Sequence, residues 1–422
     1  MSEQITRKAS AIWAFLLTIT LGVSAAQASS PDLFGLGARG AAMAGAVVSN
    51  ARDFSAVYYN PAGLIAAGIS QFSIGYQRGD YNLEMNRDDY DVDSADNLIL
   101  GFTFPIPLGG VMENRLAVGV SFLIPFAAIL EADVRPPESP LFIIVENRPR
   151  VIGLQAALSI RITDWLFVGG GVLALAELVG GIDIAPNERG QLGTVVRDEL
   201  VADYAPIIGL LVEPIDWLAI GVTFHGVSSA EFTFPITADL GSQFPIDVPR
   251  LNVVGIAQYD PMQISTDVTV HPVPELTIAA GITYKWWSAF ENPIERTTAP
   301  VPEQDPAEFS NIVVPRLGAE YEHSLEVLTL LYRTGLFWEP SPVPEQTGNN
   351  NYIDSARLGV GAGLGVRWQE LTFDFGFQWQ HLAERTHTKD PELVRDPENP
   401  GLPDLTGAGS IFVTAIEVGL LF

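Results

Sequence analysis

The chain has 422 residues, no cysteine, and 50 acidic against 23 basic residues, which gives a formal net charge of −27. The absence of cysteine excludes disulfides, thiolate metal sites and a cysteine nucleophile, and the shortage of lysine and arginine argues against a nucleic-acid partner. Only 17% of the residues are charged and 47% are hydrophobic, which is low in charge for a water-soluble protein and excludes a disordered chain.

The N-terminus has the features of a secretory signal peptide. Arg7 and Lys8 precede an apolar run at 11–23, and Ala26-Gln27-Ala28 forms an A-x-A cleavage site. A single membrane anchor is the alternative, but the run is shorter than the roughly 20 residues that a transmembrane helix needs. The pattern predicts that residues 1–28 are removed and that the mature chain is exported.

Residues 29–66 do not alternate between apolar and polar side chains. They are rich in Gly and Ala and reach the run Tyr58-Tyr59-Asn60-Pro61-Ala62-Gly63-Leu64. Asn60 can cap a helix and Pro61 suits a first helical turn, so we expect short helices broken by Gly and Pro. Residues 35–40 match G-x-G-x-x-G, but we reject a dinucleotide site because no strand precedes them and no βαβ unit follows.

From residue 67 onward, apolar residues alternate with small or polar ones at a period of two, which is typical of β-strands. In 371–380, large apolar residues at the odd positions alternate with Thr, Asp, Gly and Gln, and in 358–368 the second face is mostly glycine. A face with so few charges suits a crowded barrel lumen better than the solvent face of a sandwich. About fourteen strands are predicted, near 70–79, 95–106, 114–126, 150–163, 165–181, 197–213, 217–232, 251–270, 276–290, 311–322, 327–338, 352–368, 371–385 and 408–422.

The connections between the predicted strands alternate between short and long. Short turns recur, for example at 163–164, 214–216 and 369–370, and this alternation is the pattern of an outer-membrane barrel with periplasmic turns and longer extracellular loops. No clean apolar helical span follows residue 28, and a closed barrel is the other structure that satisfies its backbone in lipid. The long polar connections lie near 80–94, 127–149, 233–250, 291–310, 339–351 and 386–407.

The chain ends inside a predicted strand. Ile416, Val418, Leu420 and Phe422 share one face, and the terminal residue is aromatic. This ending resembles the C-terminal signal by which outer-membrane barrels are recognised for assembly. We therefore expect the barrel-assembly machinery and outer-membrane lipid among the partners.

The sequence resembles the FadL-type outer-membrane transporters, which include long-chain fatty-acid and aromatic-hydrocarbon channels. The resemblance implies an all-β fold, a transmembrane antiparallel β-barrel of fourteen strands in the outer membrane of a Gram-negative cell. It also implies a signal peptide at 1–28, an N-terminal hatch at 29–66 that plugs the lumen, and a barrel at 67–422. The matching segments are Gly37-Ala38-Arg39, 44–48, 55–64, Gly335-Leu336-Phe337, 358–374 and the terminal Phe422.

The function that this resemblance implies is passive transport of hydrophobic compounds, either long-chain fatty acids or aromatic or aliphatic hydrocarbons. In such proteins the ligand binds near the hatch and leaves sideways through the barrel wall. A general porin or a structural barrel is the alternative. The hatch-like N-terminus favours the transporter, because open porins have no such plug.

Four candidate sites have either a role in transport or a purely structural role. Asn60, Pro61 and Ala62 match the hatch motif of the family, so they either anchor and gate the plug or start a helix that packs it. The apolar loop at 139–145 either captures ligand outside the membrane or extends the fourth strand.

The other two sites concern the ligand path. Leu33, Phe34 and Leu36 either contact an apolar ligand in the lumen or pack against the wall. Pro125 interrupts the apolar third strand, and proline cannot donate to a ladder. It either produces the inward kink that opens the wall in this family or ends the strand at the outer rim.

We expect no catalytic residue, no metal site and no cofactor. The five histidines lie in scattered surroundings without the Ser or Asp neighbours that a barrel-rim hydrolase needs. The acidic loop 88–93 could hold a divalent cation, but its spacing is not that of a recognised calcium loop.

Overall fold

The computed structural model describes residues 30–126, 135–146, 152–186, 192–238, 251–292 and 304–422. The predicted signal peptide lies outside these residues. Within the described ranges, no helix is both long enough and apolar enough to cross a membrane.

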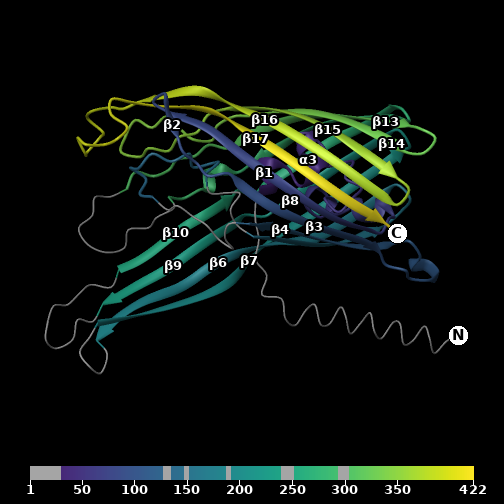
Figure 1. Ribbon diagram of the computed structural model, residues 1–422, viewed down its shortest axis with the longest axis horizontal. Coiled ribbons are helices and arrows are strands. Elements are labelled where there is room, and N and C mark those ends of the chain that lie inside the picture. The colour runs from purple at the N-terminus through teal and green to yellow at the C-terminus, as the bar shows by residue number, and fades with distance from the viewer. Residues whose placement is uncertain (1–29, 127–134, 147–151, 187–191, 239–250, 293–303) are drawn as a thin grey trace.

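The strands form one sheet that closes on itself, because β1 pairs with β17 along its whole length (Figure 1). The described strands are β1 (Gln71–Met85), β2 (Asp88–Tyr90), β3 (Ala95–Pro105), β4 (Leu116–Pro125), β5 (Gly153–Arg161), β6 (Leu166–Pro186), β7 (Leu192–Ile215), β8 (Leu218–His225), β9 (Ser228–Ala238), β10 (Leu251–Asp260), β11 (Gln263–Val273), β12 (Leu276–Lys285), β13 (Ile312–Ser324), β14 (Thr329–Glu339), β15 (Arg357–Trp368), β16 (Leu371–Thr388) and β17 (Asp404–Leu421).

The predicted fold is confirmed as a closed antiparallel barrel of 14 strands. Three of the labelled strands are not separate wall strands. The three-residue β2 lies in the loop between β1 and β3. β8 and β9 are parts of one kinked strand, as are β10 and β11, since β8 pairs with β11 in the wall while β9 pairs with β10 and, in parallel, with β6.

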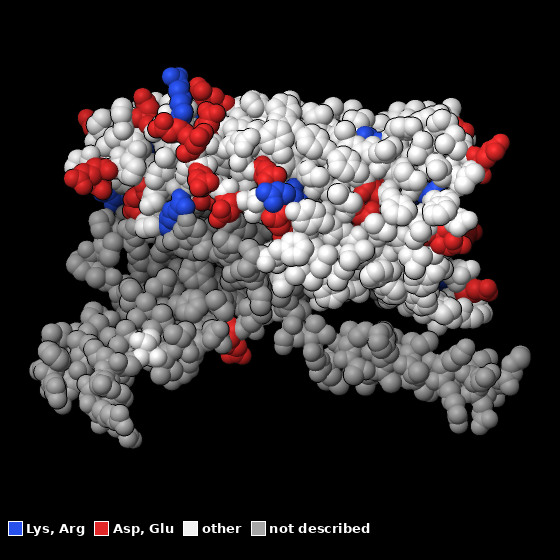
Figure 2. Space-filling model, in the orientation of Figure 1, with Lys and Arg blue, Asp and Glu red and all other residues white. Residues whose placement is uncertain are grey.

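The predicted alternation places apolar side chains on the outer surface of the barrel. Phe373 and Phe375 are exposed there, while Gly376 and Gln378 of the same strand are buried. Figure 2 shows that uncharged side chains cover much of this surface and that acidic side chains gather at the end with the long loops, on the left. An apolar outer band is what a barrel wall needs in lipid.

Several strands are longer than predicted because their ladders continue past the wall into the loops. β1 reaches Met85, which pairs with Gly407 of β17, so residues 80–85 of the predicted loop 80–94 belong to a strand. The loop at 139–145 matches neither of its two interpretations. Phe142 and Val145 are fully buried, and Leu141 forms a β-bridge with Tyr352 of another loop. This segment therefore packs into the interior at the loop end of the barrel.

Four short helices of the N-terminal segment lie inside the barrel, where most of their residues are buried. They are α2 (Ser30–Phe34), α3 (Gly37–Ala42), α4 (Ala56–Tyr59) and α5 (Gly63–Ala67). α3 packs on β14 to β17 and on β1, whereas α4 and α5 pack on β4 and β5. We call residues 30–66 the hatch.

Candidate functional site

Asn60 fastens the hatch to the barrel wall. It is 1% exposed and lies at the C-terminal end of α4. Its Nδ2 donates to the carbonyl oxygens of Val48 in the hatch and Leu210 in β7, both at 2.9 Å, and its Oδ1 accepts from the Ala62 amide at 3.1 Å. One side-chain amide therefore joins two parts of the hatch to one strand of the wall.

Pro61 and Ala62 lie directly against glycines of the wall. A Cβ atom at Gly169 of β6 would come within 2.4 Å of the Ala62 nitrogen, and one at Gly209 of β7 would come within 2.1 Å of the Asn60 Oδ1. No side chain fits at either position while the hatch is seated. The glycine-rich inner face that the sequence shows thus makes room for the hatch.

Side chains of the wall hold the same stretch of hatch backbone. Thr223 Oγ1 donates to the Tyr59 carbonyl at 2.7 Å, and His225 Nε2 lies 2.8 Å from the Tyr58 carbonyl. Ser159 Oγ donates to the Ala62 carbonyl at 3.0 Å. Carbonyls buried in the lumen need such donors, so the wall supplies a complementary seat for the motif.

We expect Asn60→Ala to loosen the hatch without unfolding the barrel. Each lost hydrogen bond costs about 1 kcal/mol, and the Val48 and Leu210 carbonyls lose a buried donor. A cysteine placed at Ser49 in this Cys-free chain should then react with a bulky maleimide at least about tenfold faster. Asn82→Ala, on the exposed face of β1, is the matched control, and equal labelling of both variants would contradict the anchoring role.

The three apolar residues near the start of the hatch lie in different surroundings. The Phe34 ring covers Gly79, where a Cβ would come within 2.3 Å of it, so this side chain packs against the wall. Leu36 is fully buried, and its amide donates to the Tyr59 hydroxyl at 2.8 Å. Of the three, Leu33 lines a cavity.

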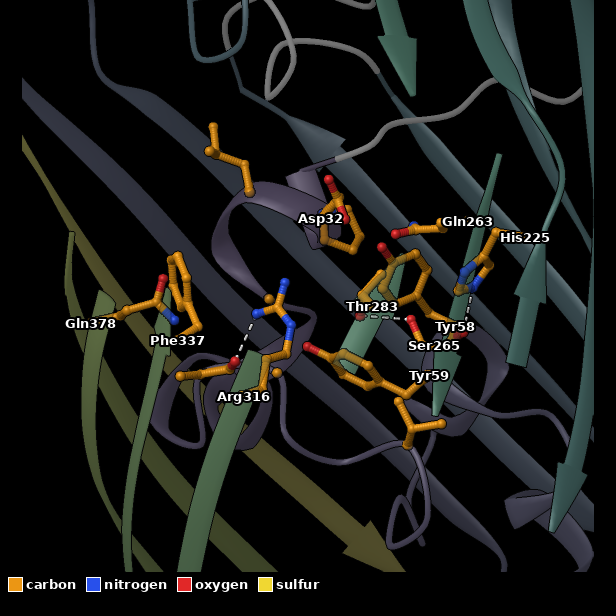
Figure 3. A pocket seen from close by; sticks show the side chains of 16 residues that line it. Asp32, Tyr58, Tyr59, His225, Gln263, Ser265, Thr283, Arg316, Phe337 and Gln378 are labelled. Atoms are coloured by element: carbon orange, nitrogen blue, oxygen red, sulfur yellow. Dashed lines mark hydrogen bonds between the residues drawn. The ribbon is translucent and has the colours of Figure 1, made fainter. Parts of the chain in front are cut away.

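That cavity lies between the hatch and the wall (Figure 3). Its volume of about 40 Å³ holds a few water molecules and is too small for a hydrocarbon chain. Tyr58, Tyr59, His225 and Arg316 line it, and Arg316 Nη1 donates to the hatch carbonyl of Ala44 at 2.8 Å. Burial raises the pKa of Tyr59 to about 12, which keeps its hydroxyl protonated at neutral pH.

A buried ionic group ties α2 to three strands. Lys285 of β12 is fully buried, and its Nζ donates to Asp32 of α2 and to Glu339 of β14, both at 2.8 Å. Arg357 of β15 also pairs with Glu339, at 2.9 Å. Buried charges persist when they are paired in this way, so the N-terminal helix is held by electrostatics as well as by packing.

On the loop side of α2 the interior is apolar and aromatic. Phe290 and Phe309 stack with their ring centroids 4.5 Å apart, and Phe309 meets Tyr352 edge-on at 5.9 Å. Trp287 and Leu33 belong to the same buried cluster. These side chains join the hatch N-terminus to the extracellular loops through continuous apolar contact.

The opposite end of the lumen is charged. A cavity of about 620 Å³ lies below the hatch, and Gln71 and Leu421 in its lining mark the short-turn end of the barrel. Arg39 of the hatch pairs with Glu320 at 3.1 Å, and Arg333 pairs with both Glu320 and Asp374. Arg52 pairs with Glu213 across the same space. An apolar solute that passes this way meets three ion pairs of the lining.

Residues 17–399 match the model of a family described as outer membrane protein transport protein (OMPP1/FadL/TodX). The chain belongs to this family. The resemblance seen in the sequence is thereby confirmed, and so is the predicted outer-membrane location.

This FadL/TodX-family chain is similar to alkane uptake protein A of Marinobacter nauticus, with 24% identity over 373 residues that cover 79% of each chain. Its fold is similar to the crystal structure of a Pseudomonas aeruginosa FadL homologue, with a TM-score of 0.62 and 15% identity over 91% of this chain and 98% of that one. It is also similar to the toluene transporter TodX of Pseudomonas putida, with a TM-score of 0.53 and 15% identity over 93% and 99%.

Pro125 is the last residue of β4, which lies between β3 and β5 in the wall. Among the described residues, the last pair between β4 and β5 is Leu123 with Gly153, and the Phe126 amide donates to the Asp96 carbonyl of β3 at 2.9 Å. Successive amides of a strand point to opposite sides. The donor that proline lacks would therefore face β5.

Lys285, Glu339 and Arg316 are not among the site residues predicted from the sequence. All three stand on inward positions of their strands, and a charge on the inner face of a predicted strand is the signal that identifies them. Their partners could not be found in the same way, because Lys285 and Asp32 are 253 residues apart.

Proposed function

We propose that this protein carries hydrophobic compounds, fatty acids or hydrocarbons, passively across the outer membrane, with residues 29–66 as the gate. The division of the lumen carries this proposal. An apolar, aromatic interior leads from the loops to Leu33, and burial there favours an apolar solute by about 25 cal/mol per Å². The similarity to an alkane uptake protein and to a toluene transporter supports the same class of solute.

The route that we propose leaves the lumen sideways, above the hatch. The paired charges of Arg39, Glu320, Arg333 and Asp374 line the straight path, and an apolar molecule there would cost these groups part of their hydration. Pro125 removes a wall donor on the loop side of the hatch, two residues beyond the last pair of β4 and β5 in the described ranges. The wall therefore offers the lower barrier, with Pro125 at the opening.

Two partners follow from the outer surface. The exposed apolar side chains of the wall suit outer-membrane lipid. Phe422 is 66% exposed beside Leu420 on the outward face of the last strand, which leaves it available to the barrel-assembly machinery.

Uptake measurements test this proposal directly. Cells with the protein should accumulate at least one of labelled dodecane, toluene and dodecanoate several-fold faster than cells without it, while sugar entry stays unchanged because the cavity beside the hatch admits little more than water. Cells that express the Asn60→Ala variant serve as a loosened-hatch comparison. Equal uptake of every apolar compound together with faster sugar entry would instead identify a general porin.

A further inference from the structure

The buried group of Lys285, Asp32, Glu339 and Arg357 carries no net charge. Lys285 has a carboxylate on either side at 2.8 Å, one from the hatch and one from β14, and Arg357 shares the second of them. The four side chains carry two positive and two negative charges and are at most 6% exposed. An incoming anion therefore meets no unpaired charge within this group.

Arg316 is a further cation beside this group, and it is also engaged. Its Nη1 donates to the Ala44 carbonyl of the hatch at 2.8 Å, and its guanidinium lies 5.1 Å over the Phe337 ring. The cavity that it lines is too small for a carboxylate with an alkyl chain. Arg316 thus supports the hatch in the closed state.

The loop end of the barrel carries negative charge, as carboxylate ligands do. Acidic side chains gather at the loop end of the barrel (Figure 2), and they lower the local concentration of an anionic amphiphile by repulsion. A neutral chain experiences no such repulsion. The exposed acidic residues of these loops include Asp88, Asp89, Asp91, Glu392, Asp396 and Glu398.

We propose that Asp32 is a tethered competitor for carboxylates: it occupies the anion position beside Lys285, so that the channel accepts neutral hydrocarbons and rejects carboxylates of the same chain length. This rests on the proposed function and narrows its solute class. A group held on the same chain competes at an effective concentration of about a millimolar or more. A free carboxylate must displace it and lose its own hydration, whereas a hydrocarbon makes no demand on Lys285.

The test compares dodecane with dodecanoate on the purified protein at pH 8, where the carboxylate is ionised. An equimolar, isotope-labelled mixture is incubated with the protein in detergent, the protein is separated by size exclusion, and bound ligand is quantified by mass spectrometry against protein-free micelles. We expect the wild-type protein to retain dodecane over dodecanoate by at least about tenfold, which corresponds to about 1.4 kcal/mol.

Three variants assign this selectivity to Asp32. Asp32→Asn leaves Lys285 without the competitor, so dodecanoate binding should rise at least tenfold while dodecane binding stays within twofold. Adding Lys285→Met to Asp32→Asn should abolish that gain. Asp53→Asn, which removes another hatch carboxylate from the lining of the lower cavity, should behave as wild type.

The outcomes separate the two proposals. Wild-type protein that retains dodecanoate as well as dodecane overturns the tethered-competitor proposal and leaves hydrophobic transport intact, and this comparison needs no variant to fold. A folded Asp32→Asn protein that binds dodecane without gaining dodecanoate overturns it as well. Wild-type protein that retains neither compound above the micelle background overturns the proposed function itself.

Discussion

A barrel without residues 30–66 is expected to admit small hydrophilic solutes that the intact protein excludes. The hatch fills the lumen so closely that Cβ atoms at Gly361 and Gly376 would come within 2.4 and 2.2 Å of hatch carbonyl oxygens. The ladder between β1 and β17 closes the wall without any hatch residue. The deletion therefore leaves a closed barrel with a small and polar inner face, as in an open porin.

The leak can be measured as arabinose entry into proteoliposomes, which we expect to rise at least tenfold. Heat-modifiable migration on a gel reports whether the shortened chain still forms a barrel. Deleting residues 109–113 instead, which lie exposed in the turn between β3 and β4, should leave arabinose entry unchanged. A folded hatchless barrel that excludes arabinose as well as the intact protein would show that the hatch does not close the lumen.

The barrel could be predicted because each strand reports its own orientation. Over 371–380 of β16 the odd positions are apolar and the even positions small or polar, so this segment alone shows which face meets lipid and which meets the lumen. The inward glycines of β15 even indicate that something packs tightly against them, and the structure shows that Gly361 faces the hatch carbonyls of Ala41 and Ala42, whereas Gly359 faces the Phe337 ring of the wall.

The kinks in two strands could not be predicted, because they depend on a neighbouring strand. The sequence reads as one strand over 217–232, but β8 ends at His225. Gly226 lies against Pro206 of β7, where a Cβ would come within 2.6 Å of the proline ring. Since Pro206 cannot donate, the ladder between β7 and β8 stops there and the chain turns away to pair with β6.

The site was predictable in part. The Asn60 motif stood out as a local run, and its side chain hydrogen-bonds to the Val48 and Leu210 carbonyls, while its role in anchoring and gating stays a prediction. The ionic group of Asp32, Lys285 and Glu339 could not be recognised in the sequence, because its members come from the hatch and from strands that are not adjacent. Their proximity is set by the closure of the barrel and the seating of the hatch, which no short stretch of sequence encodes.

Replacing Pro125 with valine is expected to slow the uptake of apolar solutes while the barrel still assembles. Valine restores an amide on the β5 side of β4, just beyond the last pair at Leu123 and Gly153, and valine favours strands. A hydrogen bond of about 1 kcal/mol added to the closed wall would reduce the open fraction about fivefold. Uptake of labelled dodecane should fall by a similar factor, with migration on a gel unchanged.

Pro315→Val is the matched control, since it replaces another wall proline, exposed on the outer face of β13 and opposite Ile282 of β12. If the opening is local to β4, this variant should take up dodecane at the wild-type rate. Equal slowing by both variants would assign the effect to general stiffening of the barrel. Unchanged uptake in a folded Pro125→Val protein would show that the solute does not leave between β4 and β5, and the charged cavity below the hatch would then have to be reconsidered as the exit.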